Sequence, residues 1–195
     1  MSSNHHPAAP MTVPATGVLL AAALALLVLA AACSRGKATS TSHRPASAGS
    51  ARVVRVIDGD TIVVELGGCQ EHVRLLGIDT PESVKPGTPP ECFSHQASNA
   101  TKAILAPGTA VRLTRDVEAR DAYGRLLAYV YLDRGNRFVN LILVERGDAG
   151  LLTYPPNTTH APELSAAQAQ ARAGGRGLWS SCGAVHHPAG PGQPP

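Results

Sequence analysis

Aromatic residues are scarce in this sequence of 195 residues, since Phe, Trp and Tyr together make up only 4% of it. Hydrophobic residues nevertheless reach 44%, which is an ordinary share for a globular protein. A core built mainly from large rings is therefore excluded, and we expect one made of Val, Leu, Ile and Ala. The length leaves room for one folded domain with tails.

The part of the chain that can fold also lacks an excess of positive charge. The net charge is +3, but three of the 17 Lys and Arg residues precede Ala51, whereas all 14 acidic residues lie at or after Asp58. The rest of the chain thus carries 14 basic and 14 acidic residues. A broad basic face for duplex nucleic acid is not indicated. Affinity for polyanions has to come from a few arginines placed together or from a metal ion.

No hydrophobic run is long enough to span a membrane. Val18–Ala32 is an apolar run, but a membrane-spanning helix needs about 20 such residues. Its length and the small residues before Cys33 are typical of a signal peptide, although no Lys or Arg precedes it. We expect export, either as a bacterial lipoprotein acylated at Cys33 and anchored to the membrane, or as a secreted protein cleaved after Ala32. The intact mass of the mature protein would distinguish the two.

Composition divides the chain into four segments. We expect residues 1–32 to be the signal peptide and residues 33–50 to be a flexible linker rich in Ser, Thr, Ala and Gly. Residues 183–195, rich in Pro and Gly, are expected to form a disordered tail. The folded unit is then 51–182.

The folded unit shows both strand and helix patterns. β-Branched runs and turn signals predict strands over 52–57, 61–66, 72–78, 110–114 and 126–132. Asp58-Gly59 between the first two strands is a hairpin signal. Helical spacing and stop signals predict helices over 94–105, 139–146 and 162–173. Five short strands with helices between and after them fit an α+β fold, a partly open OB-type barrel.

Two acidic residues are expected to lie at the same end of this barrel. Asp60 begins the second strand and Asp79 ends the third, so antiparallel pairing can bring their carboxylates together. Their repulsion has to be relieved by a proton or a cation. Because these motifs contain no Cys or His, the oxygen ligands favour Ca²⁺ or Mg²⁺ over zinc. Calcium also accepts backbone carbonyls, so Thr80 could contribute its main-chain oxygen.

Other residues near these motifs suit attack on a phosphodiester. Glu82 lies three residues beyond Asp79 and could orient or deprotonate a water. Arg74 and Arg125 could stabilise charge on phosphoryl oxygens. Tyr123 offers a hydroxyl and a ring face for the phosphate or base. The set predicts a phosphodiesterase, although each acidic motif alone is more typical of a turn.

Three motifs in this order resemble the staphylococcal nuclease (thermonuclease) family. They are Ile57-Asp58-Gly59-Asp60-Thr61, Arg74-Leu75-Leu76-Gly77-Ile78-Asp79-Thr80-Pro81-Glu82 and Asp121-Ala122-Tyr123-Gly124-Arg125. The resemblance implies an OB-fold barrel with three helices and Ca²⁺-dependent endonucleolytic cleavage of DNA and RNA, leaving 3′-phosphates. It also implies that Asp60, Asp79 and the Thr80 carbonyl bind calcium. Glu82 would be the base, and Arg74 and Arg125 would bind the scissile phosphate.

Some positions depart from the family pattern or carry further implications. Ala122 stands where well-known members have Lys, and Leu152 replaces a pocket tyrosine. Both changes are expected to affect the binding of substrate rather than the binding of metal. The resemblance also favours a Cys92–Cys182 disulfide, with Cys69 as a leftover thiol. We expect a monomer acting on single-stranded or unwound substrates.

Two other functions compete with the nuclease. Relatives of the Tudor-nuclease type use this fold as an inactive nucleic-acid or protein binding module, but they lack the calcium carboxylates that this chain retains. A structural calcium site without turnover would not need Arg74, Glu82 and Arg125 around the metal. The retained residues therefore favour the enzyme.

Overall fold

The computed structural model describes residues 49–83, 87 and 89–182. The expected signal peptide with Cys33, the linker up to residue 48 and the tail lie outside these residues. Gly49 and Ser50, expected in the linker, already belong to the first strand. Within the described part of the chain, no helix is long and apolar enough to cross a membrane.

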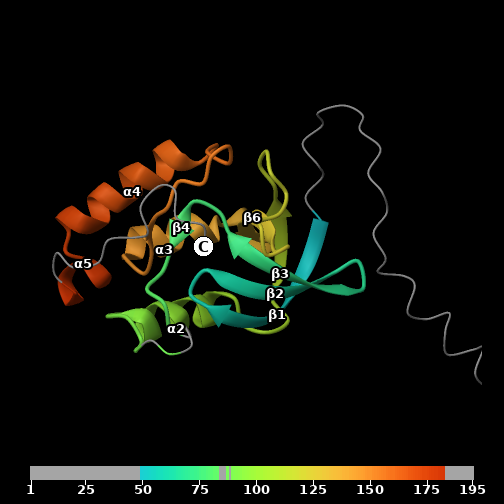
Figure 1. Cartoon of the computed structure of the whole chain (residues 1–195), viewed down its shortest axis with the longest axis horizontal. Helices are drawn as coiled ribbons and strands as arrows, with labels where there is room; N and C mark the ends of the chain where they lie inside the picture. The colour runs from blue at the N-terminus through green and yellow to red at the C-terminus, as the bar shows by residue number, and fades with distance from the viewer. Residues whose placement is uncertain (1–48, 84–86, 88, 183–195) are drawn as a thin grey trace, which may run out of the picture. The chain divides into compact units, whose positions relative to one another are not determined.

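Five strands close into a barrel in the order β1-β2-β3-β6-β5 (Figure 1). They are β1 (Gly49–Asp58), β2 (Thr61–Leu66), β3 (Cys69–Leu75), β5 (Ala110–Thr114) and β6 (Leu126–Leu132). All neighbours pair antiparallel except β3 and β6, which are parallel. The structure confirms the predicted five-stranded OB-type fold, with a closed rather than a partly open barrel.

The long first strand closes the barrel. Its start, Gly49–Arg52, pairs with β5, and the segment from Arg52 to Asp58 pairs with β2, so Arg52 has a partner on both sides. The register between β1 and β2 shifts between Val53 and Arg55 and again between Val56 and Asp58. Such bulges bend a strand and increase its twist, so β1 can serve two neighbours.

The third predicted strand, 72–78, is wrong in its bounds. The structure divides this region into β3 and a separate strand β4 (Ile78–Asp79), which pairs with β7 (Gly150–Leu151). Gly77 turns the chain between them with a φ of 78°, a backbone conformation that glycine adopts without steric cost. The break carries Asp79 away from the barrel ladder and onto a two-stranded sheet.

The three predicted helices are confirmed. They are α2 (Ser94–Ile104), α3 (Val139–Arg146) and α4 (Ala161–Ala173). A 3₁₀ turn, η2 (Arg134–Asn136), and a short helix, α5 (Leu178–Ser181), are additional. Helix α2 packs against β1, and α3 packs against both β6 and α4. The core between the barrel and these helices is built mainly from Val, Leu, Ile and Ala, as the composition predicts.

Buried Asn140 of α3 joins three parts of the fold. Its side chain has no exposed surface. Its Oδ1 accepts a hydrogen bond from the Val130 N–H (3.0 Å), and its Nδ2 donates to the Leu76 carbonyl (2.8 Å). The pairing of β3 with β6 ends at Ala128. The backbone N–H of Val130, two residues further along β6, therefore needs another hydrogen-bond acceptor, and Asn140 provides it.

Substituting Asn140 with leucine is expected to lower the free energy of unfolding by about 3 kcal/mol. The change leaves a backbone N–H and a backbone C=O buried without partners, and each costs about 1–3 kcal/mol. Denaturant unfolding followed by circular dichroism would measure it. Asn99→Leu on the exposed face of α2 is the control, with an expected change within about 0.5 kcal/mol. Equal losses of unfolding free energy from the two substitutions would contradict the role given to the Asn140 hydrogen bonds.

Candidate active site

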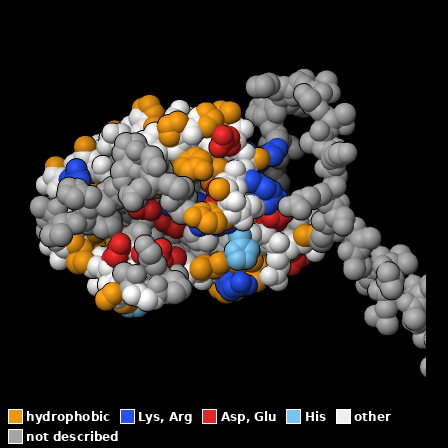
Figure 2. All heavy atoms as spheres, in the orientation of Figure 1, with side chains coloured by type: hydrophobic (Ala, Val, Ile, Leu, Met, Phe, Trp, Pro, Cys, Tyr) orange, Lys and Arg blue, Asp and Glu red, His pale blue; other side chains and the backbone are white. Residues whose placement is uncertain are grey.

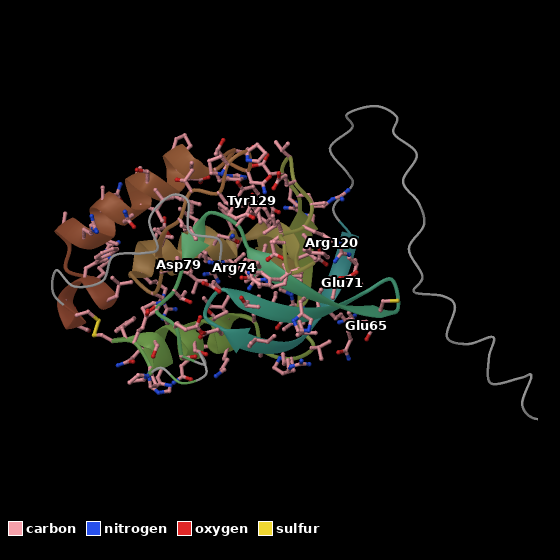
Figure 3. All side chains as sticks on the ribbon, viewed as in Figure 1. Glu65, Glu71, Arg74, Asp79, Arg120 and Tyr129 are labelled. Carbon is pink, nitrogen blue, oxygen red and sulfur yellow. A yellow bond between two sulfur atoms is a disulfide. The ribbon has the colours of Figure 1, made fainter. Side chains whose placement is uncertain are left out.

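The guanidinium of Arg74 lies between the two carboxylates expected to meet, and Figure 3 labels Arg74 and one of these two residues, Asp79. Its Nη2 is 3.2 Å from Oδ2 of Asp60 and 3.0 Å from Oδ1 of Asp79. Its Nη1 donates to the carbonyls of Leu75 (3.0 Å) and Ile78 (2.7 Å). Arg74 is only 5% exposed, so its charge needs these partners. The structure thus brings Asp60, Arg74 and Asp79 together.

Asp60 holds Thr80 beside this group. Oδ2 of Asp60 accepts hydrogen bonds from the backbone N–H of Thr80 (3.0 Å) and from its hydroxyl (3.2 Å). Oδ1 accepts from the Thr61 hydroxyl (2.9 Å). On the other side of the turn, the Thr101 hydroxyl of α2 donates to the Gly59 carbonyl (2.6 Å). The turn that carries Asp60 is therefore fixed both by the barrel and by α2.

Asp58 organises the segment that contains Glu82. Its two carboxylate oxygens accept hydrogen bonds from the backbone N–H of Ser83 (3.0 Å) and from the Ser83 hydroxyl (2.7 Å). The Glu82 side chain is also hydrogen-bonded to Asp58. Burial raises the pKa of Asp58, but the hydrogen bonds with Glu82, Ser83 and Gly59 outweigh it and hold that pKa below its usual value. Glu82 consequently lies among acidic neighbours.

Tyr123 and Arg125 come from a different loop, which Asp121 organises. The backbone N–H groups of both residues donate to Oδ1 of Asp121, at 3.0 and 2.9 Å. The Nε of Arg125 donates to Oδ2 of Asp121 at 2.6 Å. The ring of Tyr123 is largely exposed, and the guanidinium of Arg125 lies 5.4 Å from its centre. The hydrogen bonds to Asp121 thus hold Tyr123 and the Arg125 guanidinium next to each other in this loop.

Arg125 retains an unused donor. Its Nη2 is buried and has no hydrogen-bond partner. Arg125 directly precedes β6, in which Leu127 pairs with Arg74 of β3. The loop that carries Arg125 therefore enters β6 next to the strand that carries Arg74. A buried donor without a partner is costly, and an anionic ligand would satisfy it.

An outer ion pair braces the Tyr123 loop. Arg120 donates to the Gly124 carbonyl (2.7 Å) and makes two hydrogen bonds to Glu71 of β3, at 2.8 and 3.0 Å. Hydrogen bonding to Arg120 holds the pKa of Glu71 below its usual value. The loop is therefore attached to β3 as well as to β6.

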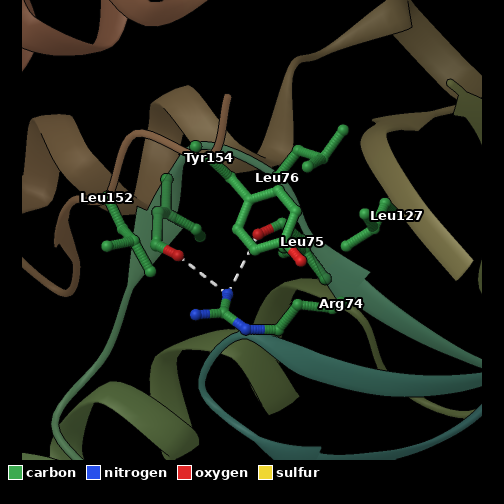
Figure 4. Close-up of a pocket in the computed structure, with 8 residues that line it drawn as sticks. Arg74, Leu75, Leu76, Leu127, Leu152 and Tyr154 are labelled. Atoms are coloured by element: carbon green, nitrogen blue, oxygen red, sulfur yellow. Dashed lines mark hydrogen bonds between the residues drawn. The ribbon is translucent and has the colours of Figure 1, made fainter. Parts of the chain in front are cut away.

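An apolar hollow opens beside Arg74 (Figure 4). Its walls come from Leu75, Leu76, Gly77, Ile78, Leu127, Leu152 and Tyr154. Leu152, the position that departs from the family pattern, is buried in this wall, and Tyr154 is partly exposed. Ala122, the other departure, is exposed. In the space-filling view, acidic side chains gather in the middle of the visible face, with hydrophobic side chains beside them (Figure 2).

The residues around Arg74 fit a hard cation. Asp60 and Asp79 share one guanidinium nitrogen, so their negative charge exceeds the positive charge beside it. The donors are all oxygens, the type that Ca²⁺ prefers. No three His, Cys, Asp or Glu side chains converge into a metal cluster within the described ranges. The protein would then supply two carboxylates and the Thr80 carbonyl, and water or substrate would fill the rest of the roughly 6–8 ligand positions.

The cysteines differ in part from expectation. Cys92 and Cys182 form a disulfide across 90 residues of sequence. Cys69 is itself disulfide-bonded, so it is not the leftover thiol that the sequence suggested. Three described cysteines are thus oxidised, which suits an oxidising compartment.

Sequence reasoning missed the residues that hold the site together. The sequence pattern marks Asp58 and Asp121 only as parts of turns, and it does not single out Glu91. An Asp whose side chain accepts hydrogen bonds from N–H groups two residues on is a known turn device, so Asp121 had a local signal. Asp58 and Glu91 contact residues at least nine positions away, and no short pattern marks such contacts.

Comparison with known proteins identifies the family. The model of the staphylococcal nuclease homologues matches residues 72–181. The thermonuclease of Staphylococcus intermedius is 42% identical over 168 residues, covering 84% of this chain and 96% of the relative. That of Staphylococcus hyicus is 37% identical over 164 residues, covering 84% and 95%. Endonuclease YncB of Bacillus subtilis is 36% identical over 132 residues, covering 67% and 62%. With its barrel, helices and ordered motifs, the chain belongs to the staphylococcal nuclease family.

Proposed function

We propose that this protein is a calcium-dependent endonuclease that hydrolyses phosphodiester bonds of DNA and RNA and leaves 3′-phosphates. The observation that carries the proposal is the Arg74 guanidinium between Asp60 and Asp79. The unpartnered Nη2 of Arg125 supplies a second donor for an anion. The relatives named thermonuclease and endonuclease support the same reaction class.

Each residue of the site is proposed to have a separate role in hydrolysis. A water oxygen attacks phosphorus while the bond to the 5′-oxygen breaks, and the leaving oxygen takes a proton from solvent. Glu82 accepts the proton of the attacking water. Arg74 and Arg125 donate hydrogen bonds to the phosphoryl oxygens, on which negative charge accumulates. Asp60, Asp79 and the Thr80 carbonyl would hold the calcium ion, which when bound would supply further positive charge to stabilise the developing anion.

The substrate is proposed to be single-stranded or locally unwound. The hollow beside Arg74 is lined by leucines and one tyrosine, and Tyr123 exposes its ring nearby in the Arg125 loop. Such surfaces suit the faces of unstacked bases, whereas bases within a duplex are already stacked. The balanced charge of the folded unit agrees with local contacts rather than with a broad duplex-binding face.

We also propose that the protein acts outside the cytoplasm as an exported monomer, either anchored through an acylated Cys33 or secreted without a lipid. The apolar run Val18–Ala32 and the disulfide-bonded cysteines support export. Mass spectrometry of the mature chain is expected to show acyl groups on an N-terminal Cys33. A mass without them would instead indicate simple secretion.

Digestion of denatured DNA tests the nuclease proposal. We expect cleavage in Ca²⁺ that stops on addition of EGTA, with products that a 3′-phosphatase can dephosphorylate. Asp79→Asn should raise the Ca²⁺ concentration required for half-maximal activity by about tenfold or more, because one charged ligand is lost. The matched control is Asp133→Asn, an exposed carboxylate that should leave the requirement unchanged.

Two results would argue against the proposal. Cleavage that persists in EGTA would contradict the role of calcium. Binding of single-stranded DNA without any cleavage would favour the inactive binding module of the same fold.

A further inference from the structure

Glu82 is held by a residue outside the barrel. Its backbone N–H donates to Oε2 of Glu91 at 2.9 Å, and the backbone N–H of Glu91 donates to the Glu82 carbonyl at 3.0 Å. The flanking residues are held differently, since Thr80 is hydrogen-bonded to Asp60 in the β1–β2 turn and Ser83 is hydrogen-bonded to Asp58 at the end of β1. Pro81 has no N–H to contribute. Glu91 thus forms a hydrogen bond with each of the two backbone polar groups of Glu82, whereas the Glu82 side chain is hydrogen-bonded to Asp58 at the end of β1.

Glu91 is covalently next to a disulfide that reaches the end of the domain. Cys92 is bonded to Cys182, directly after α5 (Figure 3). Helix α5 is fixed in turn, because the Leu178 N–H donates to the Gly147 carbonyl at the end of α3 (2.9 Å). Through Cys92 and this disulfide, the position of Glu91 is therefore tied to helices α5 and α3.

The backbone after Cys92 is in a conformation that its residue type does not favour. Phe93, at the start of α2, has a left-handed φ of 69° and makes no side-chain capping hydrogen bond. Bulky side chains rarely adopt this region, and such residues persist where the surrounding structure holds them in place. A covalent link on the preceding residue is one such restraint.

We propose that the Cys92–Cys182 disulfide, acting through Glu91, positions Glu82 for the reaction. The inference rests on the proposed nuclease function, in which Glu82 receives the proton of the attacking water. Asp60, Arg74 and Asp79 are fixed by the barrel and β4, so they do not depend on this link. Glu91 is a positioning residue, and its loss should affect turnover rather than the binding of metal or substrate.

Two substitutions of Glu91 separate geometry from charge. Glu91→Ala removes the acceptor for the Glu82 N–H and should lower kcat by about 10- to 100-fold, the effect of a small misplacement of a reacting group. The KM for a single-stranded oligonucleotide and the half-saturating Ca²⁺ concentration should stay within about twofold of the wild type, because neither depends on this contact. Glu91→Gln keeps an oxygen acceptor and should retain most of the activity.

A second set of variants tests the disulfide. The double variant Cys92→Ser/Cys182→Ser should lower kcat in the same way as Glu91→Ala, measured at a temperature where circular dichroism shows it folded. The control is Cys69→Ser, which breaks a disulfide at the opposite end of β3 from Arg74 and should leave kcat unchanged. In a Glu82→Gln background, Glu91→Ala should cause no further loss, since the two residues act as one unit.

Each of the following results would overturn the proposal: Glu91→Ala with wild-type kcat, Gln and Ala substitutions equally harmful, or an undiminished effect of Glu91→Ala in the Glu82→Gln background. Equal losses from Cys69→Ser and from the Cys92/Cys182 pair would do the same. Wild-type protein without Ca²⁺-dependent cleavage would instead refute the proposed function itself, and the inference with it. The two failures are therefore distinguishable.

Discussion

Replacing Arg74 with lysine is expected to lower kcat/KM for denatured DNA by about 10³-fold or more, the scale reported for arginines that stabilise a transferring phosphoryl group. Lysine retains the charge but not the planar fork of donors. In the structure, Arg74 uses that fork to contact two backbone carbonyls and two carboxylates at once. An ammonium group cannot reproduce this geometry, so the positive charge would be displaced from the place where we propose that it stabilises the phosphate.

The measurement separates catalysis from folding and from metal binding. Initial rates should be taken over a range of substrate and Ca²⁺ concentrations, with thermal unfolding recorded for each protein. Arg55→Lys is a suitable control because Arg55 is exposed on β1, and its activity should remain within about twofold of the wild type. A folded Arg74→Lys variant with activity within tenfold of the wild type would contradict the role given to Arg74.

Replacing Gly147 with alanine is expected to lower the free energy of unfolding by about 3–4 kcal/mol. Gly147 ends α3 with a φ of 73°, where alanine costs about 1 kcal/mol or more. An added Cβ would also lie 2.2 Å from the carbonyl oxygen of Arg176. That atom belongs to the backbone leading into α5, so relief requires a shift of the whole segment.

The control variant separates the effect of the close contact with Arg176 from the effect of the positive φ. Gly67 in the β2–β3 turn also has a positive φ (61°), but nothing lies within 4 Å of the position of its Cβ. Gly67→Ala should therefore cost only about 1 kcal/mol. Chemical denaturation of both variants gives the comparison, and equal losses would show that the contact between Gly147 and Arg176 does not limit stability.

Much of the barrel follows from local patterns. The strands 61–66, 110–114 and 126–132 were predicted with the bounds that the structure shows, because β-branched runs bounded by turn residues are local signals. The division of 72–78 was not predictable in the same way. It requires Gly77 to pass under α4, where its Cβ position lies 2.5 Å from Leu164, and Leu164 is 87 residues further along the chain.

The pairing of β4 with β7 could not be predicted from local sequence patterns either. β4 and β7 contain two residues each, too few to display a period. They exist because Asp79 and Gly150 are brought into register by the helices around them.

The sequence alone predicts which groups take part in the reaction. Asp60, Arg74, Asp79, Glu82 and Arg125 occur in short motifs whose order and spacing are specific, and their chemistry is a property of each side chain. Only the tertiary structure shows how they are held. Arg74 shared between two carboxylates, Ser83 on Asp58 and Glu82 on Glu91 are contacts between segments of the chain that fold together. The first two contacts depend on the closure of the barrel, and the third is the contact that we propose to depend on the Cys92–Cys182 link, so no periodicity or local propensity records them.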